Sequence, residues 1–221
     1  REFTANVSHE LKTPLQSIIG SVELLENDLV QPEDRPRFLG RIHQEAQRLV
    51  SLINDILGLS QLDEGAAMPR ESVSLLSLAQ EAAASLSAAA QAQNVTLTVN
   101  GTAGTLTGVR RLLSETVRNL CENAVKYNVP GGSITVTVAE TPRAVTLTVA
   151  DTGIGIPPAD QSRVFERFYR VDKSHSRAIG GTGLGLSIVK HAVAYHHGTV
   201  QLDSTPGQGT VITVTLPRDA A

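Results

Sequence analysis

The stretch FTANVSHELKTPL, residues 3–15, places a histidine beside a carboxylate on a helix that a proline disturbs one turn later. Apolar residues recur here at three- and four-residue steps, which predicts a helix with one buried stripe. The stripe comprises Phe3, Val7, Leu11, Leu15, Ile18, Val22, Leu25 and Leu29. His9 lies off this stripe, on the polar side that also carries Lys12, Thr13 and Gln16. The polar face therefore presents an imidazole with a hydroxyl one turn away.

Pro14 adds a second reason to examine this helix. It cannot donate a hydrogen bond to the carbonyl of Glu10 and it crowds that carbonyl, so we expect the helix to bend or loosen directly after His9. Such a bend would admit a phosphate donor, which makes His9 a candidate phosphoacceptor. Taken alone, an exposed helical histidine is more often only a solvated residue. The hypothesis therefore requires a site for the donor elsewhere in the chain.

Composition excludes several classes of protein. With 221 residues and 41% hydrophobic content, the chain can bury one or two cores. A net charge of −3, a pI near 6.1 and scattered basic residues argue against a nucleic-acid partner. One cysteine, Cys121, excludes an internal disulfide. The chain opens inside a helical repeat without an initiator methionine, so we expect a fragment whose upstream sensor lies in a membrane.

Two long amphipathic helices are predicted, over residues 1–30 and 37–63, with a proline-containing turn over 31–36. The second helix has a wide apolar stripe that one partner helix would cover only in part. That stripe comprises Phe38, Ile42, Leu49, Leu52, Ile53, Ile56 and Leu59. We therefore favour a homodimeric four-helix bundle, the alternative being a single hairpin packed on the rest of the chain. The predicted domains are residues 1–65 and 71–219, with a linker over 66–70.

The second domain alternates between helical and strand patterns, which predicts an α/β sandwich. Thr141-Pro142-Arg143 interrupts two alternating strands and indicates a hairpin-like connection. The expected helices cover residues 71–93, 110–127 and 183–197, and the expected strands cover 94–99, 134–138, 145–149, 199–203 and 209–216.

Polar residues gather on one side of the predicted helix 110–127. Asn119, Asn123, Lys126 and Tyr127 share a face by the 3.6-residue period. An asparagine oxygen can ligate Mg²⁺, whose shell is usually completed by water and substrate phosphates, and a lysine neutralises phosphate charge. An asparagine-rich helix face is also compatible with a plain polar surface, so this segment alone decides nothing.

Three glycine-containing segments follow it. Asp-Thr-Gly-Ile-Gly-Ile, residues 151–156, ends a predicted strand, and its glycines allow a ligand to approach the backbone. Gly-Gly-Thr-Gly-Leu-Gly, residues 180–185, opens into a helix whose free N–H groups form a natural phosphate cradle. Thr-Pro-Gly-Gln-Gly-Thr, residues 205–210, reads as a tight turn between strands. Each is a weak signal by itself.

In this order and spacing, the four segments resemble the N, G1, G2 and G3 boxes of the ATP-binding domain of sensor histidine kinases. Residues 164–170, Val-Phe-Glu-Arg-Phe-Tyr-Arg, resemble the F box, and residues 3–15 resemble the H-box. The resemblance covers nearly the whole chain. It implies a helical hairpin that forms a dimeric four-helix bundle, followed by an α/β sandwich ATP-binding domain of the histidine kinase and gyrase type.

The resemblance also implies roles for individual residues. Asn123 would hold Mg²⁺, Asn119 and Lys126 would meet the phosphates, and Asp151 would accept from the adenine amino group. The base pocket would be lined by Tyr127, Ile156 and Thr210, and the lid would run from about residue 158 to 181. The remaining ATP-binding residues would be Gly153, Gly155, Arg170, Gly181, Thr182, Gly183, Leu184 and Gly185.

One departure concerns the start of the helix that carries Asn119. Where relatives often show Gly-Asp, this chain has Gly108-Val109, so Thr107 is the candidate cap. Gyrase-type ATPases share the fold and are the enzymatic alternative. They place a water-activating glutamate four residues before the metal-binding asparagine, the position that Asn119 occupies here. Transfer to an imidazole is therefore the better interpretation.

The implied activity is ATP-dependent autophosphorylation of His9, followed by transfer to an aspartate of a response regulator. Glu10 would orient the imidazole or take its proton, and Lys126 would neutralise charge. Thr13 would align water for dephosphorylating the regulator, or else only bond back to the carbonyl of His9. A scaffold that binds ATP without transferring phosphate is the non-enzymatic alternative. We expect a cytoplasmic kinase core that contacts a membrane only through its upstream sensor segment.

Overall fold

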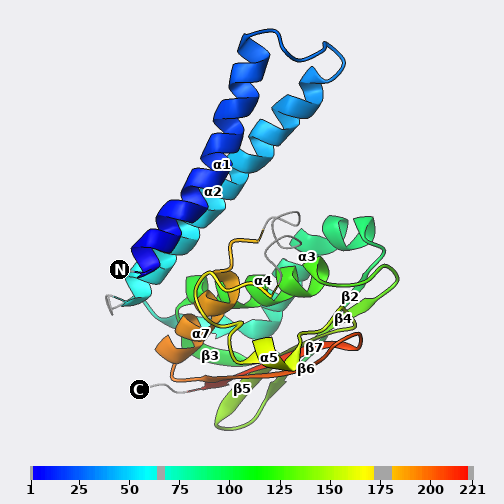
Figure 1. Cartoon of the computed structure of the whole chain (residues 1–221). Helices are drawn as coiled ribbons and strands as arrows, with labels where there is room; N and C mark the ends of the chain where they lie inside the picture. The colour runs from blue at the N-terminus through cyan, green and yellow to red at the C-terminus, as the bar shows by residue number, and fades with distance from the viewer. Residues whose placement is uncertain (1, 64–67, 172–180, 219–221) are drawn as a thin grey trace.

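The computed structural model describes residues 2–63, 68–171 and 181–218 of the chain. Two long antiparallel helices, α1 (Glu2–Glu26) and α2 (Arg35–Asp63), form a hairpin that projects from an α/β unit (Figure 1). Arg35 donates to Asp28 at 2.5 Å across the connecting turn. Helix α1 continues through Pro14 without a break. The predicted hairpin is confirmed, while the bend after His9 stays a prediction.

The α/β unit contains a mixed five-stranded sheet in the order β2-β4-β5-β7-β6. Its strands are β2 (Thr96–Gly101), β4 (Ser133–Glu140), β5 (Ala144–Asp151), β6 (Thr199–Thr205) and β7 (Gly209–Pro217). Strand β2 pairs with β4 in parallel, and the other neighbours are antiparallel. The predicted turn at Thr141 is confirmed, since its N–H donates to the carbonyl of Ala144 at 2.8 Å.

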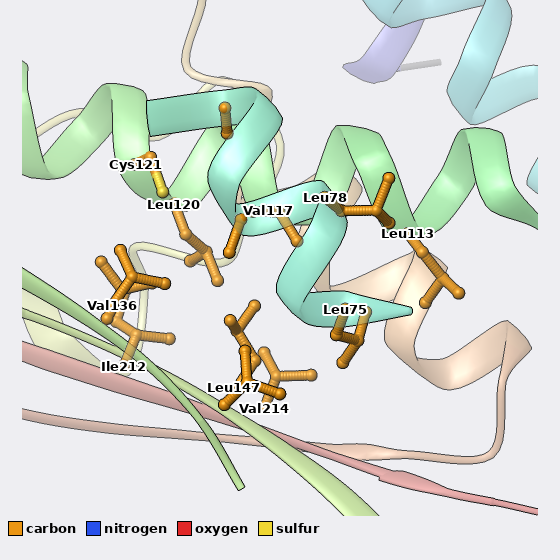
Figure 2. Close-up of a cluster of buried hydrophobic side chains, with 14 of the residues drawn as sticks. Leu75, Leu78, Leu113, Val117, Leu120, Cys121, Val136, Leu147, Ile212 and Val214 are labelled. Atoms are coloured by element: carbon orange, nitrogen blue, oxygen red, sulfur yellow. The ribbon is translucent and has the colours of Figure 1, made fainter. Parts of the chain in front are cut away.

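Helices α3 (Leu75–Ala92), α4 (Arg110–Lys126) and α7 (Gly185–Tyr195) lie over one face of this sheet (Figure 1). Figure 2 shows how aliphatic side chains of the helices meet those of the strands, with Leu78, Val117 and Leu120 facing Leu147 and Val214. The strands alternate, so threonines occupy the opposite face and stay half-buried: Thr135, Thr137, Thr146, Thr148, Thr213 and Thr215. The sequence expectation of an α/β sandwich is confirmed.

Two short strands were not expected. Strands β1 (Glu71–Ser74) and β3 (Thr105–Gly108) form a separate antiparallel pair, so the prediction of a helix starting at residue 71 was wrong for its first turn. Ser74 ends β1 and caps α3, accepting a hydrogen bond from the N–H of Ser77 at 3.3 Å. A further short helix, α5 (Pro158–Gln161), follows the strand that ends at Asp151.

The expectation that Thr107 caps helix α4 was wrong. Thr107 lies within β3, paired with Ser72, and the residue at the cap position is Val109, which has no capping side chain. Instead the N–H of Val109 donates to Nε2 of His196 at 2.9 Å, while Nδ1 of that buried ring lies 2.7 Å from the carbonyl of Ala192. The imidazole of His196, at the end of α7, therefore accepts the N–H at the start of α4 in place of a capping side chain.

The hairpin and the α/β unit contact each other directly. Leu52 and Leu59 of α2 form a buried apolar cluster with Leu184 and Ile188, which lie at the start of α7. Arg111 of α4 also donates to Gln61 of α2 at 2.8 Å. Within the described parts of the chain, no helix is both long and apolar enough to cross a membrane. The predicted domain limits stay a prediction, and residues 66 and 67 of the predicted linker lie outside the described residues.

Candidate active site

A cavity of about 320 Å³ lies where α4, the ends of β5 and β7, the glycine-rich loop and helix α2 come together. Its volume is near the lower end of the range for small-molecule sites. Most of the residues predicted to bind nucleotide line it: Asn119, Asn123, Lys126, Tyr127, Asp151, Gly155, Ile156, Arg170, Gly181, Thr182, Gly183, Gly185 and Thr210. Gly153 and Leu184 do not line it. The four motifs, distant in sequence, thus meet at one site.

Asp151 stands at the end of β5 with one carboxylate oxygen already engaged. Its Oδ1 accepts from the N–H of Gly153 at 2.8 Å and from the N–H of Thr210 at 3.2 Å. Burial raises the pKa of Asp151, and these two backbone hydrogen bonds oppose that rise. Among the described residues nothing donates to Oδ2, so that oxygen remains available to an amino group in the cavity.

The turn before β7 brings Thr210 to this carboxylate. Thr210 is paired with Asp151 in the β5–β7 register, and Gly209 adopts φ +113° beside it. A Cβ on Gly209 would come within 1.9 Å of the carbonyl oxygen of Asp151, so only glycine fits. The sequence motif of residues 205–210, uninformative alone, is thereby explained by the close approach of two strands.

Sequence reasoning missed two supporting residues. Ser204 accepts from the N–H of Ile156 at 2.8 Å and lies 2.8 Å from the hydroxyl of Thr210. Gln161 of α5 donates to the carbonyls of Ile156 and Ser204 at 2.9 and 2.8 Å. Both fix the backbone around Ile156 and Thr210, which line the cavity. A lone serine in a strand and a glutamine after two prolines give no sequence signal for this role.

The polar face of α4 forms the opposite wall. Asn119 is nearly buried and donates to the carbonyl of Glu115 at 2.9 Å, which leaves its Oδ1 available. That oxygen would lie 2.9 Å from a Cβ on Gly185, so a side chain there would disturb it. Lys126 is half-buried, and its pKa falls to about 8. Burial is the largest cause, and the positive charges of Arg170 and Arg48 add to it.

The glycine-rich loop is held between the cavity and the hairpin. Gly183 adopts φ +73° and packs on the backbone of Phe168. The N–H of Phe168 donates to the carbonyl of Gly183 at 2.8 Å. Leu184 is fully buried against α2 rather than facing the cavity. Thr182 donates to Asp55 of α2 at 3.0 Å. Helix α2 therefore supplies part of the cavity wall, which the sequence did not predict. Residues 172–180 of the predicted lid lie outside the described residues.

The phosphoacceptor candidate lies close to this site. His9 is exposed on α1, and its neighbour Glu10 accepts from Arg170 at 2.6 Å and lies 3.8 Å from Arg48. Arg170 itself lines the cavity. Thr13 is exposed, and its hydroxyl donates to the carbonyl of His9 at 3.3 Å. This is the local hydrogen bond expected if Thr13 only stabilises the helix before Pro14.

The residues present fit a nucleotide with its metal ion. No cluster of three or more histidine, cysteine, aspartate or glutamate side chains arranged to hold a metal occurs in the part of the chain that the structure describes. A magnesium ion bound here would depend on neutral amide oxygens and on phosphates, as its ordinary coordination allows. The amides of Asn119 and Asn123 and the cations Lys126 and Arg170 provide such a setting.

Comparison with known proteins agrees with this geometry. Residues 1–65 match the His Kinase A (phospho-acceptor) domain, and residues 108–220 match the histidine kinase-, DNA gyrase B-, and HSP90-like ATPase domain. The chain is 39% identical over 223 residues to the sensor-like histidine kinase SenX3 of Mycolicibacterium smegmatis, covering 98% of this chain and 57% of that protein. It therefore spans little more than half the length of this curated relative.

Two solved structures show similar architecture. Full-length ShkA in complex with AMPPNP matches with a TM-score of 0.73 and 28% identity, over 100% of this chain and 46% of that one. ThkA in complex with the response regulator protein TrrA matches with a TM-score of 0.77 and 21% identity, over 99% and 61%. The chain belongs to the histidine kinase family. It carries the phosphoacceptor and ATPase-type domains of a two-component sensor kinase core.

Proposed function

We propose that the chain uses ATP to phosphorylate His9. The observation that carries the proposal is the cavity in which Asp151, the amides of α4, Lys126 and the glycine-rich loop meet, beside an exposed histidine. An imidazole nitrogen of His9 would form a bond to the γ-phosphorus as the bond from that phosphorus to the bridging oxygen breaks. ADP would leave with that oxygen, and the imidazole proton would pass to Glu10.

The cavity residues would divide the work of binding. Oδ2 of Asp151 would accept from the adenine amino group, and Tyr127, Ile156 and Thr210 would enclose the base. Asn123 would hold Mg²⁺, which would neutralise phosphate charge when bound. Asn119, Lys126 and the backbone at the start of α7 would contact the phosphates. The AMPPNP bound by ShkA supports a nucleotide role for the equivalent domain.

Radiolabelling with γ-labelled ATP tests the acceptor. We expect acid-labile, base-stable label on the unmodified chain and none on His9→Gln, with nucleotide affinity unchanged, because the acceptor and Asp151 lie on separate units. His43→Gln is the matched control, since His43 is an exposed histidine of α2 far along the hairpin. Label retained by His9→Gln, or lost from His43→Gln, would contradict the assignment.

ATP hydrolysis in the manner of gyrase remains the enzymatic alternative. Glu122 is the carboxylate of α4 that lines the cavity, but it pairs with Arg118 at 3.1 Å and is the residue next to Asn123 rather than one turn before it. That ion pair engages the Glu122 carboxylate, and its place on the helix differs from that of the gyrase glutamate. Steady phosphate release from His9→Gln at the rate of the unmodified chain would favour hydrolysis over transfer.

We further propose that the phosphoryl group passes to an aspartate of a response regulator and that two hairpins pair as a dimer. The ThkA–TrrA complex supports the first step, although its 21% identity establishes the fold alone. Exposed apolar side chains on the hairpin support the second: Leu15, Ile19, Val50, Ile53 and Leu57. Ile53→Glu should give a monomer in sedimentation experiments, and an unchanged dimer would remove this interface.

Thr13 would serve in dephosphorylating the regulator. Its hydroxyl is exposed and only weakly engaged with the carbonyl of His9, so it is free to orient water. Thr13→Ala should preserve autophosphorylation while lengthening the lifetime of the phosphorylated regulator. Loss of autophosphorylation together with helix stability would instead show that the backbone hydrogen bond before Pro14 is its main role.

A further inference from the structure

Arg170 joins the two parts of the molecule at the residue next to the phosphoacceptor. It follows α5 in the chain, yet its Nη2 donates to Oε2 of Glu10 on α1 at 2.6 Å. The Arg170 side chain is 6% exposed and that of Glu10 is 18% exposed, so the ion pair is largely shielded from water. Arg48 lies 3.8 Å from the same oxygen, too far for a hydrogen bond.

The same guanidinium belongs to the nucleotide cavity. Arg170 lines it together with Lys126, and the charges of Arg170 and Arg48 both act on the Lys126 ammonium. Arg170 and Arg48 therefore lie beside Glu10, and both also act on Lys126 in the cavity wall. Among the described residues, Nε of Arg170 is buried without an acceptor, so Glu10 does not satisfy the guanidinium.

A nucleotide phosphate would be the stronger partner for these cations. Phosphate oxygens carry more charge than one carboxylate, and a guanidinium binds them in a bidentate fashion. The N–H groups of Arg170 that point to Glu10 cannot donate fully to both anions. Arrival of phosphate at Arg170 would therefore loosen its hold on Glu10.

We propose that Arg170 is a positioning residue that holds Glu10 while the cavity is empty and exchanges it for a nucleotide phosphate. No covalent bond forms or breaks in this exchange. The carboxylate beside His9 becomes free to orient the imidazole only when the phosphoryl donor is in place. The inference rests on the proposed function and adds to it a coupling between nucleotide occupancy and the residue next to the acceptor.

Calorimetry with Mg²⁺ and the non-hydrolysable analogue AMPPNP tests the exchange through a double-mutant cycle. Glu10→Gln removes the competing charge, so we expect AMPPNP to bind about threefold or more tightly. In the Arg170→Gln background, the same Glu10→Gln change should have no further effect. Arg170→Lys keeps the positive charge but loses the bidentate N–H donors of the guanidinium, so it should show an intermediate coupling. Circular dichroism checks that each variant folds.

Two controls separate this coupling from a general effect. Glu45→Gln alters another half-buried carboxylate of the hairpin, which lies 3.9 Å from Arg48, and should leave AMPPNP affinity unchanged. Adenosine, which has no phosphate, should bind all variants equally. Equal tightening by Glu10→Gln with and without Arg170, no tightening, or tightening toward adenosine would overturn the proposal. Failure of the unmodified chain to bind AMPPNP would refute the proposed function itself.

Discussion

The ammonium group of Lys126 is held where its charge is disfavoured. Burial in the cavity wall is the main cause, the guanidinium groups of Arg170 and Arg48 add to it, and Glu122 opposes it, so the pKa falls to about 8. A bound phosphate would supply the missing counter-charge and raise the pKa again. Nucleotide binding above pH 8 would therefore be accompanied by proton uptake.

This linkage predicts a pH-dependent affinity. The protonated form is favoured in the complex, so affinity should be constant with respect to Lys126 below its pKa of about 8 and fall as pH rises above it. The limit for one group is about tenfold per pH unit. Lys126→Arg should remove this dependence, because a guanidinium stays charged. Calorimetry between pH 7 and 9.5 measures it, and an identical slope in Lys126→Arg would assign the effect to another group.

Single residues were predictable where the chemistry is encoded by a motif. Asp151 and the asparagines of α4 could be predicted to share one cavity because a strand-ending aspartate and a polar helix face are visible in the sequence. Ser204 and Asp55 could not, because their roles depend on which backbone or side chain the fold brings opposite them. Leu184 sits within the glycine motif, yet burial against α2 directs its side chain away from the cavity.

Among the secondary-structure elements, α7 and α4 are coupled through one imidazole. His196 at the end of α7 accepts from Val109 at the start of α4, and this requires a neutral ring. Burial lowers the pKa of His196 below 6.5, in agreement with that role. Gly108 accommodates the ring, since a Cβ there would lie 3.0 Å from it.

Removing this imidazole should destabilise the fold. His196→Phe keeps a ring but leaves the N–H of Val109 unpaired, which should lower the free energy of unfolding by about 1 to 3 kcal/mol. Because the pKa is depressed in the folded state, the stabilisation is full above pH 6.5 and is lost as pH falls below it. Urea unfolding at pH 7.5 and 5.5 should show a smaller pH effect in the variant. His43→Ala, an exposed histidine, is the control, and matching its stability would contradict the capping role.

The long elements were predictable because their hydrophobic periods are sustained. Both hairpin helices and the strands around Val136 and Leu147 match the expected ranges within a few residues. The strand pair β1 and β3 could not be predicted from the sequence. Each strand has only four residues, and its extended conformation depends on pairing with a segment distant in the chain. The cap of α4 was missed for the same reason: its acceptor is distant in sequence.

At the scale of the whole molecule, Asp55 marks the contact between hairpin and α/β unit. Burial raises its pKa to about 6, Glu115 and Glu122 act in the same direction, and Thr182 and Arg118 oppose the rise. Separation of the two parts would return the pKa toward 3.8. The docked form thus binds a proton more tightly, so docking is favoured at low pH and weakened as pH rises through about 6.

This contact should open with rising pH. Small-angle X-ray scattering should show the radius of gyration of the chain increasing between about pH 4 and pH 6. Asp55→Asn imitates the protonated carboxyl and should remain compact across this range. Asp203→Asn, an exposed aspartate of β6, should behave like the unmodified chain. A compact unmodified chain at all these pH values, or an Asp55→Asn variant that opens equally, would show that Asp55 does not control docking.

How the two parts meet was beyond sequence reasoning. The apolar stripe of α2 is visible in the sequence, which favours a helical bundle and leaves packing on the rest of the chain as the alternative. Part of the stripe, Leu52 and Leu59, packs on the start of α7. An apolar stripe shows that a helix face is buried but carries no information about which surface covers it.

The packing of α7 on α2 connects the hairpin directly to the loop that lines the cavity. Leu184 and Ile188 are gripped by α2, while Gly183 and Gly185, their neighbours in the chain, line the cavity. A rotation of α2 about its own axis would move the first turn of α7 and, with it, the glycine-rich loop. A rotation of the hairpin would therefore reach the cavity without an intermediate element. The rigidity of the contact between α2 and α7 would set how much of that rotation reaches Gly183 and Gly185.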